Sequence, residues 1–68
     1  MKSKEFVEKV QRIEIKNGTI FDVIKENKKI GEIGVIKSQI MYLNFDNNNI
    51  PTDILVGNYD FIQQIEGE

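Results

Sequence analysis

The sequence predicts a small α+β domain, in which an N-terminal helix packs on an antiparallel β-meander of about four strands and a short helical C-terminal tail follows. Three observations carry this prediction. A helical amphipathic pattern opens the chain, two β-prone runs flank an Asn-Gly pair, and two further apolar segments alternate with the period of a strand. The 68 residues are expected to form one domain, 1–68, with a small core and a narrow stability margin.

The helix is predicted over Ser3–Gln11. Ser3 suits the N-cap, and Glu5 lies in the first turn, where the helix dipole favours a carboxylate. The apolar residues with helical spacing are Phe6, Val7, Val10 and Ile13. Because so short a helix is marginal alone in water, we expect this apolar stripe to dock on the sheet.

A β-hairpin is predicted over Ile13–Ile24, because Asn17-Gly18 is a strong signal for a tight turn between strands. Two registers are possible. A two-residue type I′ loop would place Asp22 on the face that holds Ile13, whereas a type I turn followed by a glycine bulge would pair Ile13 with Phe21. We favour the bulged register, since it gives one cleanly apolar face.

Two further strands are predicted at Lys29–Ile36 and Gln39–Phe45, because both alternate apolar and polar residues. The cluster Asp46–Asn49 is typical of a turn. We predict one interrupted or two short helical segments over 50–68. A fifth strand at Asp53–Val56 is the alternative for this tail.

These strands have two faces, and both are rich in apolar residues. The face expected under the helix and the tail holds Ile13, Ile15, Phe21, Val23, Ile33, Val35, Met41, Leu43 and Phe45. The opposite face would hold Ile20, Ile24, Ile30, Ile36, Ile40 and Tyr42 around Asp22. A one-sided antiparallel sheet is normally polar on its open face, so this surplus requires a second cover: the tail, a second copy of the chain or a target protein.

The composition argues against an enzyme. There is no Cys and no His, which removes disulfides, the usual zinc ligands and thiol or imidazole catalysis. The acidic residues are spread singly, and no nucleophile elbow, phosphate loop or dinucleotide fingerprint occurs. We therefore expect no catalytic residue, no metal, no cofactor and no small-molecule substrate. With no apolar run of signal-peptide or membrane-span length, the expected compartment is the cytoplasm.

Charge is distributed unevenly along the chain, although the net charge is only −2. All nine basic residues lie in 1–37 with six acidic ones, which gives +3, whereas 38–68 holds five acidic residues and no basic one, which gives −5. Such a division can mark surfaces for partners of opposite charge, or it can be erased when the two halves interleave on folding.

The favoured function is a cytoplasmic interaction protein that occludes a surface of a target protein. Its expected contact residues are Ile20, Asp22, Ile24 and Tyr42, with Asp22 directed at a basic target. One alternative is a structural homodimer. Another is a nucleic-acid-binding rim made of Lys25, Lys28 and Lys29, although the acidic net charge, the single Arg and the lack of a known binding motif argue against a nucleic-acid partner.

The segment Lys16-Asn17-Gly18-Thr19-Ile20-Phe21-Asp22, with Glu5-Phe6 at the start of the helix, resembles the paratox-like family of small prophage-encoded inhibitors. There too a Lys-Asn-Gly turn leads into Ile-Phe-Asp after an N-terminal helix. The resemblance implies a cytoplasmic α+β protein that inhibits a regulator by binding its DNA-binding domain, and it points to Phe21 and Asp22 as contact residues. It stops before Lys25, and the spacing from helix to hairpin is shorter here, so it does not identify the target.

Overall fold

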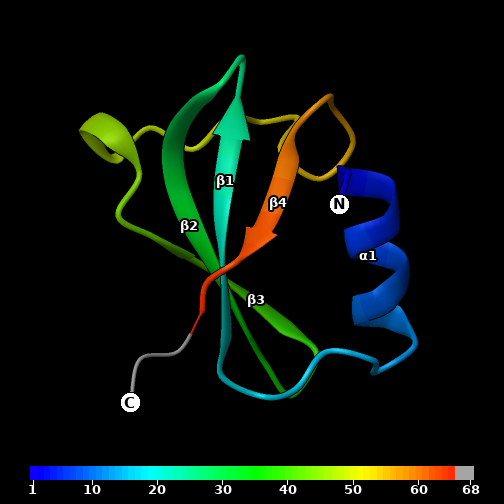
Figure 1. The fold of residues 1–68 in the computed structure, drawn as a ribbon. Coiled ribbons are helices and arrows are strands. Elements are labelled where there is room, and N and C mark those ends of the chain that lie inside the picture. The colour runs from blue at the N-terminus through cyan, green and yellow to red at the C-terminus, as the bar shows by residue number, and fades with distance from the viewer. Residues whose placement is uncertain (66–68) are drawn as a thin grey trace.

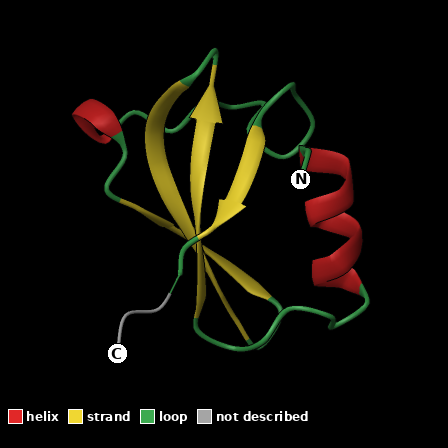
Figure 2. Ribbon diagram, in the orientation of Figure 1, coloured by secondary structure: helices red, strands yellow, loops and turns green. Residues whose placement is uncertain are grey.

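The computed structural model describes residues 1–65, and within them one helix packs against a four-stranded antiparallel sheet (Figures 1 and 2). The elements are α1 (Ser3–Gln11), β1 (Thr19–Lys25), β2 (Lys28–Ile36), β3 (Gln39–Leu43), the 3-10 turn η1 (Asp46–Asn48) and β4 (Asp60–Gln63). The strands lie in the order β3-β2-β1-β4. The predicted α+β class, with an N-terminal helix on an antiparallel sheet, is confirmed.

The helix α1 has the predicted bounds and turns Ser3, Phe6 and Val10 toward the interior. Ser3 has a different role from the one expected, because the N-cap residue is Lys2. The buried Ser3 hydroxyl instead donates a hydrogen bond of 3.2 Å to the carbonyl of Ile54. Ser3, which was predicted as the N-cap, thus connects the helix to the segment before β4.

The residues after α1 form a loop, and the predicted hairpin over Ile13–Ile24 is wrong. The Ile13 N–H donates to the carbonyl of Val10 at 3.1 Å, and the Glu14 N–H donates to that of Lys9 at 2.9 Å. These two bonds make a Schellman motif, which reverses the chain at the end of a helix. Ile13 has a φ of +57° and is 78% exposed, so it cannot begin a strand that packs on the core.

The pair Asn17-Gly18 forms a turn that leads into β1 and does not connect two paired strands. Gly18 has a φ of +89°, and its N–H donates to the carbonyl of Val35 at 2.8 Å. The Asn17 Oδ1 atom accepts a hydrogen bond of 2.7 Å from the Lys37 N–H. The pair therefore attaches the loop to the end of β2, and neither predicted register occurs.

Two tight hairpins connect the first three strands, through Glu26-Asn27 and through Lys37-Ser38, both of which fall between segments predicted as strands. All four turn residues have positive φ, between 52° and 65°. This geometry is that of type I′ turns, whose twist matches the twist of the flanking strands. Only the asparagine has a recognised preference for such angles, so here the sheet determines the turn conformation more than the turn residues do.

The fourth strand comes from the tail, where helical segments were predicted. β4 pairs antiparallel with β1, at the place expected for the first strand of the hairpin. The prediction of helices over 50–68 is wrong for its described part, because residues 52–56 form turns, β4 is extended, and η1, just before the tail, is a single 3-10 turn. The alternative strand at Asp53–Val56 is wrong as well, and residues 66–68 lie outside the described range.

An aromatic cluster at the centre of the core explains why the tail completes the sheet. The Phe6 ring stacks on the Phe61 ring, with centroids 4.5 Å apart and planes 7° apart, and it meets the Phe21 ring edge-on at 5.2 Å. All three rings are at most 1% exposed. Contacts of Phe61 with α1 and β1, which are distant from it in the sequence, thus stabilise β4 at its place in the sheet. The other buried hydrophobic residues are Val10, Val23, Ile33, Val35, Phe45, Ile54 and Tyr59.

The two faces of β3 are the reverse of those predicted. Because Lys37-Ser38 is a two-residue turn, Val35 pairs with Ile40 and Ile33 with Tyr42, which places Ile40 and Tyr42 on the helix side of the sheet. The open side receives two other residues of the strand, Met41 and Leu43. Ile30, which was expected on the open side, also packs against the core.

Phe45 reaches the core as predicted, although β3 ends before it. Asn44 has a φ of +52° and redirects the chain at the end of the strand. The Phe45 ring then covers Gly31 of β2, where the Cβ of any other residue would overlap the ring. Gly31 is therefore required by close packing of an aromatic ring on the backbone, as expected for a glycine inside a strand.

Candidate protein-interaction surface

The face of the sheet opposite α1, called the open face, carries apolar side chains that remain in contact with solvent. Ile36, Met41 and Ile62 are 43%, 46% and 54% exposed, although they come from three different strands. The strand pairings place them on this face with three half-buried residues, and the apolar set is Ile20, Ile24, Ile36, Met41, Leu43 and Ile62. Apolar side chains thus occur on all four strands of the open face.

A polar cluster lies among these apolar side chains. The Lys29 ammonium lies 3.2 Å from Asp22 Oδ1 and 2.8 Å from Glu32 Oε2, so one cation pairs with two carboxylates. The Gln64 amide donates to Asp22 at 2.8 Å, and the Asn44 amide donates to Glu32 at 3.2 Å. Each carboxylate therefore interacts with two donors, and both carboxylates lie on the paired strands β1 and β2.

The same contacts shift the pKa values of the three charged groups. The hydrogen bond from Gln64, aided by Lys29, lowers the pKa of Asp22, while partial desolvation opposes this shift. Lys29, and secondarily Asn44, lower the pKa of Glu32. Glu32, followed by Asp22, raises the pKa of Lys29. All three groups stay charged at neutral pH, so two carboxylates and one ammonium leave the cluster with one net negative charge.

The structure brings together three of the five residues expected to bind a protein. Ile20, Asp22 and Ile24 share the open face, because they alternate along β1. Phe21 is 1% exposed in the core, where a partner cannot touch it. Tyr42 is 38% exposed but lies on the helix side, with its ring 6.2 Å from that of Phe45.

Three apolar residues of the open face were not expected on it: Met41, Leu43 and Ile62. Met41 and Leu43 could have been found by counting strand pairs outward from the two-residue turn between β2 and β3. Ile62 could not, since its position depends on β4, which the sequence pattern did not reveal.

The three lysines proposed for nucleic-acid binding do not act as one basic surface. Lys29 is engaged by two carboxylates of the open face. Lys25 points its ammonium at the Tyr59 ring, 4.7 Å from the centroid, in a cation–π contact. Lys28 is exposed beside the turn between β1 and β2. The structure therefore divides these charges among different environments.

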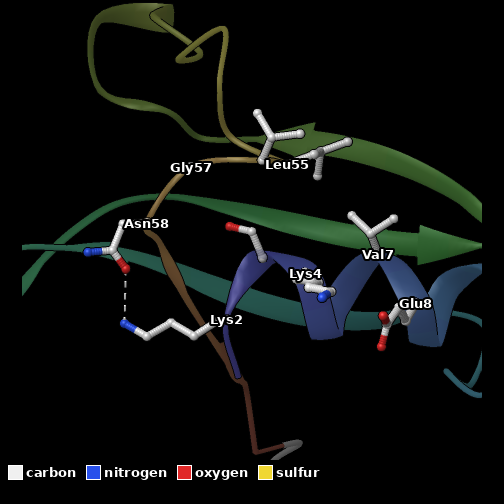
Figure 3. Close-up of a pocket in the computed structure, with 9 residues that line it drawn as sticks. Lys2, Lys4, Val7, Glu8, Leu55, Gly57 and Asn58 are labelled. Carbon is white, nitrogen blue, oxygen red and sulfur yellow. Dashed lines mark hydrogen bonds between the residues drawn. The ribbon is translucent and has the colours of Figure 1, made fainter.

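A second surface, a shallow groove of about 810 Å³, lies between α1 and residues 55–58 (Figure 3). Val7, Leu55 and Val56 line it, and charged or polar side chains stand at its rim. Lys2 is held there by Asn58 Oδ1 at 3.3 Å and by Asp60 at 3.0 Å. The buried hydroxyl beside the groove, that of Ser3, is already bonded to Ile54. The groove thus offers a small apolar surface without a free buried polar group.

Within residues 1–65, no group of three or more Asp or Glu side chains is placed to hold a metal ion. No helix in this range is long and apolar enough to cross a membrane. Comparisons with protein-family models, with curated proteins and with solved structures find no match to this chain. The resemblance to the paratox-like proteins therefore rests on Lys16–Asp22 and Glu5-Phe6 alone.

Proposed function

We propose that this protein is an interaction module that binds a target protein through the open face of its sheet and occludes the surface it covers. The observation that carries the proposal is the exposure of Ile36, Met41 and Ile62 on a face where an antiparallel sheet is normally polar. Exposed apolar side chains on the open face of a sheet are typical of protein–protein interaction sites.

The polar cluster would determine how a target is oriented on this surface. Asp22 and Glu32 are held in place by donors from β2, from the end of β3 and from the residue after β4, so little side-chain entropy is lost on binding. Since the cluster is negative by one charge, the fitting target has an apolar patch next to a Lys or Arg side chain. Aliphatic burial would provide the affinity, and the carboxylates would fix the orientation.

An inhibitor of the kind that the paratox-like resemblance implies needs only such an occluding surface, and it needs no catalytic group. Of the residues that the resemblance singles out, Asp22 is on the open face and Phe21 stabilises the strand from the core side. Binding of nucleic acid receives less support, because Lys25 and Lys29 are already engaged within the molecule.

The test is a comparison of two matched isoleucine substitutions in affinity capture from a cell lysate. Ile62→Lys places a charge in the open face, yet Ile62 is paired directly with Asp22, so the fold should tolerate it. Ile13→Lys makes the same change at an exposed residue after α1. We expect a captured protein that the Ile13 variant retains and the Ile62 variant loses by at least about tenfold, the cost of a residue that contributes strongly to an interface.

Melting temperatures of both variants serve as the folding control. Equal capture by the two variants, with both folded, would show that the target binds elsewhere and would reject the open face as the binding surface.

A further inference from the structure

The two edge strands of the sheet, β4 and β3, differ in whether another backbone segment covers them. The outer edge of β4 is covered by the start of the chain: the Met1 amino group donates to the Phe61 carbonyl at 2.8 Å, and the Phe61 N–H donates to the Met1 carbonyl at 2.6 Å. Lys2 adds a bridge and an ion pair with Asp60. At the other edge β3 pairs with β2, and no other backbone segment of residues 1–65 pairs with it (Figure 1).

The backbone groups that β3 presents outward can be identified from the register. The Val35 carbonyl accepts a bond from Gly18, so the backbone of Val35 points toward β1 and away from β3. Ile40, opposite Val35, is therefore in a pair without hydrogen bonds to β2. Because these directions alternate along a strand, the N–H and C=O groups of Ile40 and Tyr42 point outward.

This edge lacks the features that normally prevent strands from pairing. Proteins protect edge strands with charged residues, prolines, bulges or a covering segment. The five residues of β3 include no charge, no Pro and no Gly, and they are Gln39, Ile40, Met41, Tyr42 and Leu43. Met41 and Tyr42 are also well exposed. The edge is thus open and uncharged over its full length.

We propose that β3 pairs antiparallel with β3 of a second copy of this chain, in a register centred on Met41, so that two sheets join into one. In this register Ile40 of each copy faces Tyr42 of the other, and the outward N–H and C=O groups of both residues are satisfied. Each such pair also sets an aromatic ring beside a β-branched side chain, a favourable cross-strand combination. A second copy is the partner that fits, because the edge is complementary to itself and no like charges meet.

The proposal goes beyond the function proposed above and does not depend on it. Met41 lies on the open face, so pairing at β3 would make the open faces of two copies continuous. A target with two equivalent sites could then be bound twice, at a high effective concentration for the second contact.

Disulfide trapping tests the register directly, because the chain has no Cys. Met41 of the two copies would form a pair without hydrogen bonds, whose Cα atoms lie about 4.5 Å apart, within the range that a disulfide bridges. Ile62→Cys is the matched control: Ile62 is on the same face with similar exposure, 54% against 46% for Met41, but it lies on the opposite edge strand. Under mild oxidation of purified protein, we expect Met41→Cys to convert to covalent dimer at least about tenfold faster than Ile62→Cys.

Two further measurements use the chain without cysteines. Sedimentation of the wild type at tens of micromolar should give twice the monomer mass. Tyr42→Pro removes an outward N–H while leaving the bonds between β2 and β3, and a proline is tolerated at such edge positions, so this variant should sediment as a folded monomer.

A monomeric wild type, equal trapping of the two cysteine variants, or a folded Tyr42→Pro variant that remains dimeric would overturn the self-pairing. These results are separable from the capture experiment, because a monomer that still binds its target through Ile62 would overturn the self-pairing alone.

Discussion

The two faces of the sheet are made from the same four strands and are stabilised in different ways. On the helix side, Phe6, Phe21 and Phe61 are excluded from water, so their contribution follows the buried apolar area and the quality of packing. On the open face, Asp22 and Lys29 form an ion pair that solvent reaches, and such pairs contribute little to stability. The fold therefore depends on one face, and the other can change with little loss of stability.

The largest effect on the free energy of unfolding is expected in β4, where substitutions at two neighbouring residues should differ. Phe61→Ala removes a ring from the core and should lower the free energy of unfolding by about 3–5 kcal/mol, comparable to the whole stability of a small domain. Ile62→Ala, one residue later on the open face, should cost less than about 1 kcal/mol. Urea denaturation of both variants measures the difference. Similar losses would mean that the open face also stabilises the fold.

An intermediate effect is expected at the glycine beneath Phe45. Gly31→Ala inserts a methyl group where the ring now lies on β2, and overpacking of this kind costs about 1–3 kcal/mol. Gly34→Ala is the matched control on the same strand, since its new methyl group would meet the nearest side-chain atom, on Leu43 of the open face, at an ordinary 3.6 Å. Thermal unfolding should show a clear drop for the first variant and little change for the second; equal melting temperatures would contradict the close packing of Phe45.

The smallest effect is expected from the polar cluster, and it depends on pH. The pKa values of Asp22 and Glu32 are lower in the folded chain than in the unfolded one, so their contribution is complete above the unfolded values near pH 4. It is lost as the pH falls further, because the unfolded state then binds protons first. Lys29→Met should make this acid-side decline in melting temperature shallower between pH 5 and pH 2, without abolishing it, since the Gln64 bond to Asp22 remains. An unchanged slope would show that Lys29 contributes nothing to either carboxylate.

Features set by local pattern could be predicted from the sequence. The bounds of α1 followed from its helical period, and the burial of Phe21 and Val23 followed from alternation along β1. The same alternation groups Ile20 with Asp22 on the open face, whatever precedes β1. That part of the site therefore remained correct although the hairpin register used to argue for it does not occur.

Features set by distant contacts could not be predicted in this way. β4 is a strand because Phe61 packs on Phe6, and a single-sequence pattern contains no sign of that pairing. The loop after α1 was missed for a different reason: a Schellman motif normally has glycine at the position that Ile13 occupies, and a β-branched residue there reads as the start of a strand. The sequence carries no other sign of this helix end, so the strand preference of Ile13 led to the wrong prediction.

The position of β4 at one edge of the sheet also has a kinetic consequence. The two hairpins of β1, β2 and β3 involve neighbouring residues and can close within microseconds. The bond between Gln64 and Asp22 instead spans 42 residues, and long-range pairing forms slowly. During synthesis β1 therefore has no β4 beside it until residues 60–63 have been made, and an unpaired strand edge favours aggregation.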